Sequence, residues 1–228
     1  EIYKKLGLAW MAPELREQQG EIEAAESNQL PELLTLDDIR GDLHMHTRET
    51  DGRATLEEMA AESKARGYEY IAITDHSKAL AMANGLDETR ALEHARAIRA
   101  LNERLDGITV LAGIECDIRP DGSMDLANDC LAALDIVIAS VHSAFNMDEQ
   151  QMTDRVLAAI ANPHVDVVAH PTGRLILKRE GYRLDLERIR PLPERVATRT
   201  QDPADEAVLP SNARSASPRS TFILLNTY

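Results

Sequence analysis

Short apolar runs alternate with longer amphipathic stretches along residues 37–170 of the chain. The apolar runs have no polar face, as is typical of parallel strands that helices cover on both sides. An alternation of such strands with helices predicts βα units around a parallel sheet. The five predicted strands cover residues 39–46, 70–74, 108–112, 136–141 and 165–169.

Capping residues mark the helices between these strands. Thr55 and Glu58 form a capping box, which predicts a helix that begins there and ends at Gly67. A second helix is predicted over 86–105, a stretch rich in alanine, leucine, glutamate and arginine. A third helix, with an aspartate at its N-cap, is predicted over 148–161. Each of these helices would connect two successive strands.

Both ends of the chain differ from this central pattern. Residues 1–36 are acidic, mildly amphipathic and broken by proline and glycine, so we predict a lead-in segment there. Residues 189–228 hold five of the ten prolines and no glycine, and we predict a poorly ordered tail rich in proline, arginine and serine. Its apolar residues 222–225 could add a strand. The domain itself is predicted to span residues 37–188.

Composition limits the classes of protein to which the chain can belong. Its 228 residues suit one domain of moderate size, and 43% of them are hydrophobic, which is enough for a buried core. The 39 acidic and 25 basic residues leave a formal net charge of -14. This charge argues against a protein that binds nucleic acid over its whole surface, although a local basic strip is compatible with it.

Cysteine usage and hydropathy point to a cytoplasmic protein without a membrane partner. Cys116 and Cys130 form neither a disulfide framework nor a CxxC metal knuckle, so we expect free, buried thiols in a reducing compartment. No apolar run approaches the roughly 18 residues of a membrane span, and no signal peptide is visible. The chain starts at Glu1 without an initiator methionine, which indicates a piece of a longer protein.

Every predicted strand ends in a side chain that can bind a metal ion. In a parallel βα barrel the C-terminal ends of the strands converge on one face, so these side chains are expected to share one small volume. Histidine and carboxylate ligands without a thiolate suit Zn, Mn or Fe better than Ca or Mg. The side chains concerned are His44, His46, Asp75, His76, Glu115, His142 and His170.

The spacing of these residues suggests how ions would be held. His44 and His46 are two residues apart on a strand, so their side chains leave the same face and can chelate one ion. Glu115 can bridge two ions with its two oxygens, and His142 and His170 can complete a second site. Burying so many polar groups without a shared partner would cost on the order of 1–3 kcal/mol each.

Other polar residues are expected to have structural or surface roles. His94 lies in the middle of the second helix and is predicted to face solvent, and His164 is predicted to lie in a surface turn. Asp117, Asp121 and Asp125 are predicted to lie in loops or turns.

Eight short motifs lie around the candidate ligands: GDLHMHT at 41–47, TDG at 50–52, ITDHS at 73–77, GLDE at 85–88, GIE at 113–115, PDGS at 120–123, ASVHS at 139–143 and AHPTGRL at 169–175. In this order they resemble the motifs of the PHP (polymerase and histidinol phosphatase) domain. The likeness covers about residues 1–188 and is closest to the C-terminal PHP domain of bacterial family X DNA polymerases. The lead-in resembles the join between the polymerase thumb and that domain.

This resemblance implies a fold, an activity and a set of cofactors. The fold would be an α/β protein with a distorted (β/α)7 TIM-like barrel, of which about five βα units are present. The activity would be a metal-dependent phosphoesterase, a 3′–5′ exonuclease in DNA repair, with two or three divalent ions of Mn, Zn or Fe. The partners would be DNA, as a single strand or a 3′ end, and an upstream polymerase domain.

The resemblance also assigns roles to individual residues. The first ion would be held by His44, His46 and Glu115, the second by Glu115, His142 and His170, and the third with help from Asp51 and His76. In such an enzyme we expect Glu115, His142 and Arg174 to act in catalysis. Phosphate oxygens would be steered by Lys78, Arg174 and Lys178.

One departure from the family pattern leaves alternatives open. The family's last motif supplies an aspartate and a histidine from a final strand, and this chain has no histidine after His170. We therefore expect a C-terminally truncated or altered barrel. Two other readings are a catalytically impaired structural remnant of the domain and a small-molecule phosphatase similar to histidinol phosphatase.

Overall fold

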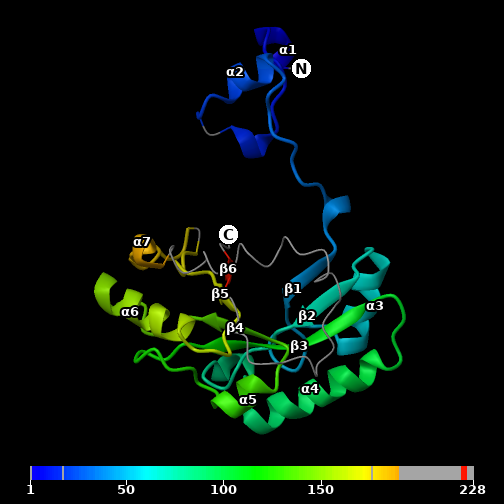
Figure 1. Cartoon of the computed structure of the whole chain (residues 1–228), viewed down its shortest axis with the longest axis vertical. Helices are drawn as coiled ribbons and strands as arrows, with labels where there is room; N and C mark the ends of the chain where they lie inside the picture. The colour runs from blue at the N-terminus through cyan, green and yellow to red at the C-terminus, as the bar shows by residue number, and fades with distance from the viewer. Residues whose placement is uncertain (1, 17, 176, 190–221, 225–228) are drawn as a thin grey trace. The chain divides into compact units, whose positions relative to one another are not determined.

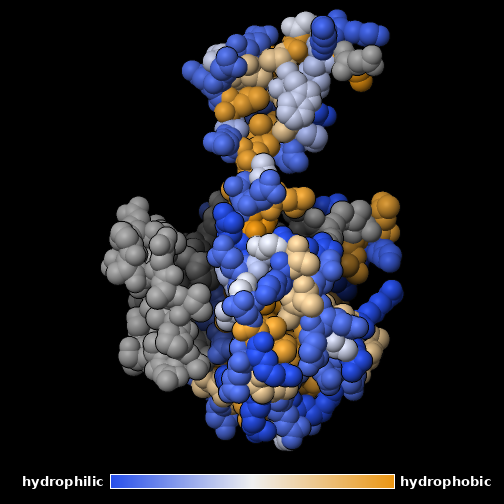
Figure 2. All heavy atoms as spheres, turned by 90° about the vertical axis from the view of Figure 1, so that its right-hand side faces the viewer, coloured by the Kyte–Doolittle hydropathy of each residue, from blue (hydrophilic) through white to orange (hydrophobic). Residues whose placement is uncertain are grey.

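The computed structural model describes residues 2–16, 18–175, 177–189 and 222–224, which fall into two compact units, Glu1–Ile39 and Arg40–Tyr228. The first unit contains the short helices α1 (Ile2–Leu6) and α2 (Glu21–Glu26) (Figure 1). Figure 2 shows apolar side chains at its surface, and the exposed large ones include Ile2, Leu6, Trp10 and Ile22.

The second unit is built on a curled sheet of six parallel strands that follow one another in chain order (Figure 1). Sequential parallel strands require a crossover between each pair, which is the βα arrangement that the hydrophobic pattern predicts. The sheet forms part of a TIM-like barrel, so the predicted incomplete barrel is confirmed. Its strands are β1 (Gly41–Met45), β2 (Tyr70–Ile73), β3 (Thr109–Asp117), β4 (Ile136–Ser140), β5 (Val167–Ala169) and β6 (Phe222–Leu224).

Helices cross between the strands and begin at the residues that the sequence marks. Thr55 and Glu58 form the predicted capping box. Asp148 caps the third predicted helix, and its side chain accepts a hydrogen bond from the backbone of Gln151. Two short helices, α5 and α7, are absent from the sequence prediction. The helices of this unit are α3 (Leu56–Ala65), α4 (Glu88–Asn102), α5 (Asn128–Ala132), α6 (Glu149–Ile160) and α7 (Leu186–Ile189).

The two faces of the sheet bury different sets of side chains. The outer face packs alternate strand residues such as Ile71, Ile73 and Val137 against helical residues such as Ile98. The inner face buries a small apolar cluster of Ala72, Ile136, Ile138, Val167 and Ala169. Because side chains alternate along a strand, Glu115 lies on the same inner face as Leu111, which packs against this cluster. The inner face is therefore apolar at one end and polar at the C-terminal end.

The third strand is longer than predicted, and the apolar segment near the C-terminus forms a further strand. The third strand was predicted to stop at residue 112, but β3 continues to Asp117, because Glu115 and Asp117 sit in parallel register with β4. The apolar segment near the C-terminus does form a strand, since β6 pairs in parallel with β5 through Val167 and Phe222. The predicted poor order of the tail concerns residues 190–221 and 225–228, which lie outside the described residues.

Within the described ranges, no helix is long and apolar enough to cross a membrane. The visible face of the second unit is mostly hydrophilic (Figure 2).

Cys116 and Cys130 are free and buried, as predicted. Burial, helped by the charges of Glu88 and Asp129, raises the pKa of the Cys130 thiol to about 11. Because the thiolate is the reactive form, iodoacetamide at about pH 8 should modify Cys130 of the native chain roughly 100-fold more slowly than in the denatured chain. Mass spectrometry of timed samples measures both rates, and equal rates would contradict the burial of this thiol.

Candidate metal centre

The C-terminal ends of five strands place polar side chains on the inner face of the sheet. His44 lies on β1 and His46 follows it directly. His76 follows β2 and pairs with Glu115 of β3 as an isolated parallel bridge. His142 comes two residues after the end of β4, and His170 directly follows β5.

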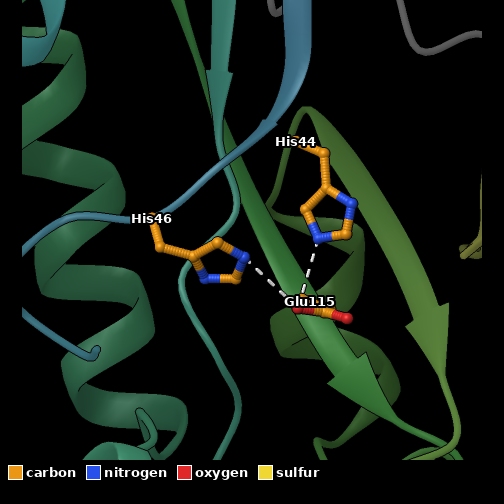
Figure 3. A group of neighbouring side chains, drawn as sticks. All are labelled: His44, His46 and Glu115. Atoms are coloured by element: carbon orange, nitrogen blue, oxygen red, sulfur yellow. Dashed lines mark ion pairs between the residues drawn. The ribbon is translucent and has the colours of Figure 1, made fainter. Parts of the chain in front are cut away.

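One oxygen of the Glu115 carboxylate faces three imidazoles. Glu115 Oε2 lies 3.2 Å from His44 Nε2 and 3.4 Å from His46 Nε2. Figure 3 shows these two rings pointing at the carboxylate from the first strand. The same oxygen lies 3.2 Å from His76 Nδ1. The side chain of Glu115 is only 2% exposed, so its charge is screened by these rings rather than by water.

The other oxygen of Glu115 faces the fourth and fifth strands. Glu115 Oε1 lies 3.2 Å from His142 Nε2 and 2.9 Å from His170 Nε2. It also accepts a hydrogen bond from the Ser140 hydroxyl at 2.7 Å. Five imidazoles therefore surround one buried carboxylate.

The backbone of His170 is strained where the ring meets Glu115. His170 has a φ of 31°, in the left-handed region that residues with a side chain rarely adopt. Its carbonyl accepts a hydrogen bond from Gly173 N at 2.8 Å, which closes the turn that follows. Strain of this kind persists where surrounding contacts hold it, and it clusters at functional sites.

The side chains form three trios that could each hold a metal ion. In every trio the ligand atoms lie within 4.8 Å of one another. Two buried ring nitrogens of these trios, His46 Nδ1 and His76 Nδ1, have no hydrogen-bond partner in the described part of the chain, and an ion would satisfy them. The donor set of imidazole and carboxylate fits a divalent transition metal. The trios are His44, His46 and Glu115; His46, Asp51 and His76; and His76, Glu115 and His142.

These trios differ in part from the groups that the family resemblance implies. The first trio has the expected members. Where the second ion was expected, His76 joins Glu115 and His142, while His170 approaches the same carboxylate oxygen as His142. Where the third ion was expected, the ring of His46 joins Asp51 and His76, with Asp51 oxygens 3.6 Å from His46 Nδ1 and 3.4 Å from His76 Nε2.

The proximity of the imidazoles controls the ionisation of the centre. Burial raises the pKa of Glu115, but hydrogen bonds from His142, His170 and His44 outweigh it and hold that pKa well below its ordinary value. Burial lowers the pKa of His46, and the charge of Glu115 offsets this only in part. The carboxylate is therefore ionised, as a metal ligand must be.

His142 is oriented by a carboxylate that the sequence prediction had placed in a loop. Asp117 lies on β3, is 4% exposed, and its Oδ1 is 2.5 Å from His142 Nδ1. Burial lowers the pKa of His142, but hydrogen bonds with Asp117 and Glu115 outweigh it and raise that pKa to about 9. A carboxylate on one ring nitrogen directs the other nitrogen toward the metal position. The two-residue spacing between Glu115 and Asp117 was the available signal, since it puts both side chains on the same strand face.

Replacing Asp117 with asparagine should weaken metal binding about 10- to 100-fold, the usual effect of losing the partner of a ligating histidine. The neutral amide of asparagine accepts a weaker hydrogen bond from His142 Nδ1 than the carboxylate does, so the tautomer and orientation of the ring are no longer fixed. Titration of the purified variant with Mn²⁺ measures the affinity. Asp121→Asn is the matched control, because Asp121 is exposed and bonds only Ser123 in the described ranges. Equal affinity for both variants would contradict the role of Asp117.

One further prediction about a polar residue is wrong. His94 was expected to face solvent, but its side chain is 10% exposed and its Nε2 lies 3.0 Å from Asp75 Oδ2. It shares a helix face with the buried Ala91 and Ile98, three and four residues away, so helical periodicity contained this signal. Asp125 lies in a bend outside the strands, as predicted, but it is only 2% exposed and accepts a hydrogen bond from Ala79 N at 2.7 Å.

The residues predicted to steer phosphate make no described contact with the trios. Lys78 Nζ is 2.5 Å from Glu88 Oε1, so its charge is already paired. Arg174 and Lys178 are exposed on the segment that follows His170. No hydrogen bond or ion pair of the described residues joins their side chains to the candidate ligands. Their role stays a prediction.

Comparison with known proteins identifies the family. A family model of the PHP domain matches residues 42–187. The chain is 40% identical over 230 residues to the Bacillus subtilis protein named DNA polymerase/3'-5' exonuclease PolX, a match that covers 100% of this chain and 40% of the relative. It is 34% identical over 153 residues to a protein of Acetivibrio thermocellus named probable phosphatase, a match that covers 65% of this chain and 58% of the relative.

A probable phosphatase of Citrobacter koseri is 35% identical over 136 residues, which cover 57% of this chain and 52% of the relative. The chain thus spans less than two thirds of the length of each of these relatives. The span matched by the family model contains all of the strand-end candidate ligands. This chain belongs to the PHP domain family.

Proposed function

We propose that this chain is a metal-dependent phosphoesterase domain that removes nucleotides from the 3′ end of DNA. The observation that carries the proposal is the ring of five imidazoles around the buried carboxylate of Glu115. Burying a carboxylate among so many imidazoles costs free energy unless ions are bound, and an apolar core would stabilise the fold better. The cluster is therefore better explained by metal binding than by packing. The relative named as a polymerase and 3'-5' exonuclease, which matches this whole chain, supports the choice of DNA as substrate.

Two or three bound divalent ions would supply an activated water and a clamp for the oxygens of the phosphate. The chain's own residues prepare this chemistry. Glu115 stays ionised and presents one oxygen to each side of the centre. Asp117 directs the ring of His142 toward Glu115. Asp51 is 51% exposed, so it marks the open side of the centre, from which a phosphate would approach.

The proposed contact for the DNA backbone is the basic segment after β5, residues 174–179, which contains Arg174, Lys178 and Arg179. Arg179 holds this segment in place, because its Nε and Nη2 donate to the Gly173 carbonyl and its guanidinium lies 3.8 Å from the centroid of the Phe145 ring. Arg174 and Lys178 are left exposed there and are free to meet phosphate oxygens. An upstream polymerase domain is a further proposed partner, because the relative of which this chain covers 40% is named a DNA polymerase.

A small phosphate monoester is the second candidate substrate. Relatives named probable phosphatases match 57–65% of this chain. The same ion trios would serve a monoester and a diester, so the site alone does not separate the two substrates. A catalytically impaired remnant is the third possibility that the experiment has to separate, since the family's final motif is missing.

The test combines metal analysis with two substrates. The purified chain is loaded with Mn²⁺, its ions are counted by elemental analysis, and it is then given single-stranded DNA labelled at either end or histidinol phosphate. We expect two or three ions and release of nucleotides from the 3′ end. Hydrolysis of the monoester alone would move the assignment to a phosphatase. Bound ions with no hydrolysis of either substrate would leave only the remnant.

A further inference from the structure

Besides Glu115 and Asp117, a further buried carboxylate, that of Asp75, lies beside the metal centre without belonging to any trio. Asp75 follows β2, is 0% exposed, and is in none of the three trios. Its Oδ1 accepts hydrogen bonds from Thr47 N at 2.8 Å and from the Thr50 hydroxyl at 2.5 Å. Its Oδ2 accepts from the Thr47 hydroxyl at 2.7 Å and lies 3.0 Å from His94 Nε2. The carboxylate therefore holds a loop on one side and a helix on the other.

The loop that Asp75 holds is the one that carries Asp51. The backbone nitrogens of Thr50 and Gly52 both donate to the Thr47 carbonyl, so the loop is a tight turn. Gly52 approaches the chain so closely that an added Cβ would lie 2.3 Å from the carbonyl oxygen of His46. The turn is thus packed against the ligand His46 and tied down by Asp75.

Asp51 depends on this loop more than any other ligand depends on its surroundings. The other members of the three trios lie on strands or within three residues of a strand end, where the sheet fixes their backbones. Asp51 lies in the turn and is half-exposed, and its only described ion pairs are with the rings of His46 and His76. Only the turn keeps its carboxylate within ligand distance of those rings.

From this arrangement we infer that Asp75 and His94 are positioning residues for one metal position, the trio of His46, Asp51 and His76. They act through the hydroxyls of Thr47 and Thr50, which fix the turn that presents Asp51. The inference rests on the proposed metal-dependent function. It predicts that removing a single hydroxyl outside the ligand set lowers the affinity of one ion.

The decisive pair of variants is Thr50→Val and Thr50→Ser. Valine has the shape of threonine without the hydroxyl, whereas serine keeps the hydroxyl that bonds Asp75. Mn²⁺ binding to the purified chain is measured by competition with a fluorescent chelator, and Asp51→Asn identifies which ion belongs to this trio. We expect Thr50→Val to weaken that same ion about 10-fold or more, Thr50→Ser to keep the affinity of the unchanged chain, and the double variant with Asp51→Asn to be no weaker than Asp51→Asn alone.

Asp75→Asn and His94→Gln extend the test, with Asp135→Asn as the matched control. Like Asp75, Asp135 accepts from a backbone nitrogen, that of Ala112, but its described partners, Ala112 and Arg99, belong to no ligand loop. We expect losses for the first two variants and unchanged affinity for the control. Circular dichroism of the metal-free variants shows whether each is folded, and Thr50→Val decides the matter if Asp75→Asn does not fold.

The failures of the two proposals are distinguishable. If the unchanged chain binds Mn²⁺ and Thr50→Val binds it equally well, the positioning role is overturned while the proposed function stands. If Thr50→Ser loses as much affinity as Thr50→Val, the hydroxyl is not the reason and the inference is also overturned. A chain that binds no Mn²⁺ in any form overturns both.

Discussion

Replacing Glu115 with glutamine should reduce phosphoester hydrolysis by at least about 1000-fold, which corresponds to several kcal/mol of transition-state stabilisation. Glu115 belongs to two of the three trios, so one substitution removes a negative ligand from both. Glutamine keeps the shape of the side chain and one acceptor oxygen, but it cannot offer a charged oxygen to the rings on each side. The expected result is a loss of bound ions together with a loss of activity.

Elemental analysis and a nuclease assay on the same preparation measure both effects. Glu62→Gln is the control, because Glu62 is an exposed carboxylate on α3 that pairs only with Arg66 in the described part of the chain. Surface pairs of this kind contribute little, so the control should keep its ions and its activity. A Glu115→Gln chain that retains full metal content would contradict the central role of this carboxylate.

Replacing Arg155 with alanine should lower the free energy of unfolding by about 3–5 kcal/mol. Arg155 lies on α6 and is 2% exposed. Its guanidinium donates to the Ile118 carbonyl after β3 and, at 2.9 Å, to the Ser143 carbonyl after His142. No ion pair of Arg155 occurs among the described residues, so the backbone oxygens are what satisfy its charge. Alanine would leave the buried Ile118 carbonyl without its donors, remove the bond to the Ser143 carbonyl and leave a cavity between helix and sheet.

Thermal unfolding followed by circular dichroism checks this expectation, with a fall in melting temperature of roughly 10 °C for a chain of this size. Arg188→Ala is the control, since Arg188 is 40% exposed and pairs at the surface with Asp154 of the same helix as Arg155. That variant should change stability by less than about 1 kcal/mol. Equal melting temperatures for the two variants would show that Arg155 is not a structural tie.

The elements of this fold could be read from local signals. Helices begin where capping residues stand, at Thr55 and Asp148, because a cap satisfies backbone nitrogens within a few residues. Strands were likewise predictable from short runs of β-branched apolar residues, because these side chains favour extended backbone. The end of β3 could not be read in this way, because Glu115 and Asp117 join the strand through hydrogen bonds with β4 and not through their own propensity.

The candidate ligands were also predictable as a set, but their partners were not. The rule that parallel strands converge at their C-terminal ends is enough to gather the histidines near Glu115. The rule says nothing about which carboxylate meets which ring. Asp117 beside His142, and Asp75 between Thr50 and His94, join segments of the chain that lie 19 to 25 residues apart.

The amino-acid sequence alone therefore specifies the alternation of strands and helices, the residues at which helices begin and the residue types that could hold divalent ions. Each of these depends on neighbours within one turn of a helix or on the alternation of side chains along a strand. Folding in three dimensions settles which oxygen of Glu115 each imidazole faces, how the turn with Asp51 is held, and which charges are buried. Those properties arise from distances between remote segments, and such distances exist only once the strands have paired and the helices have packed against them.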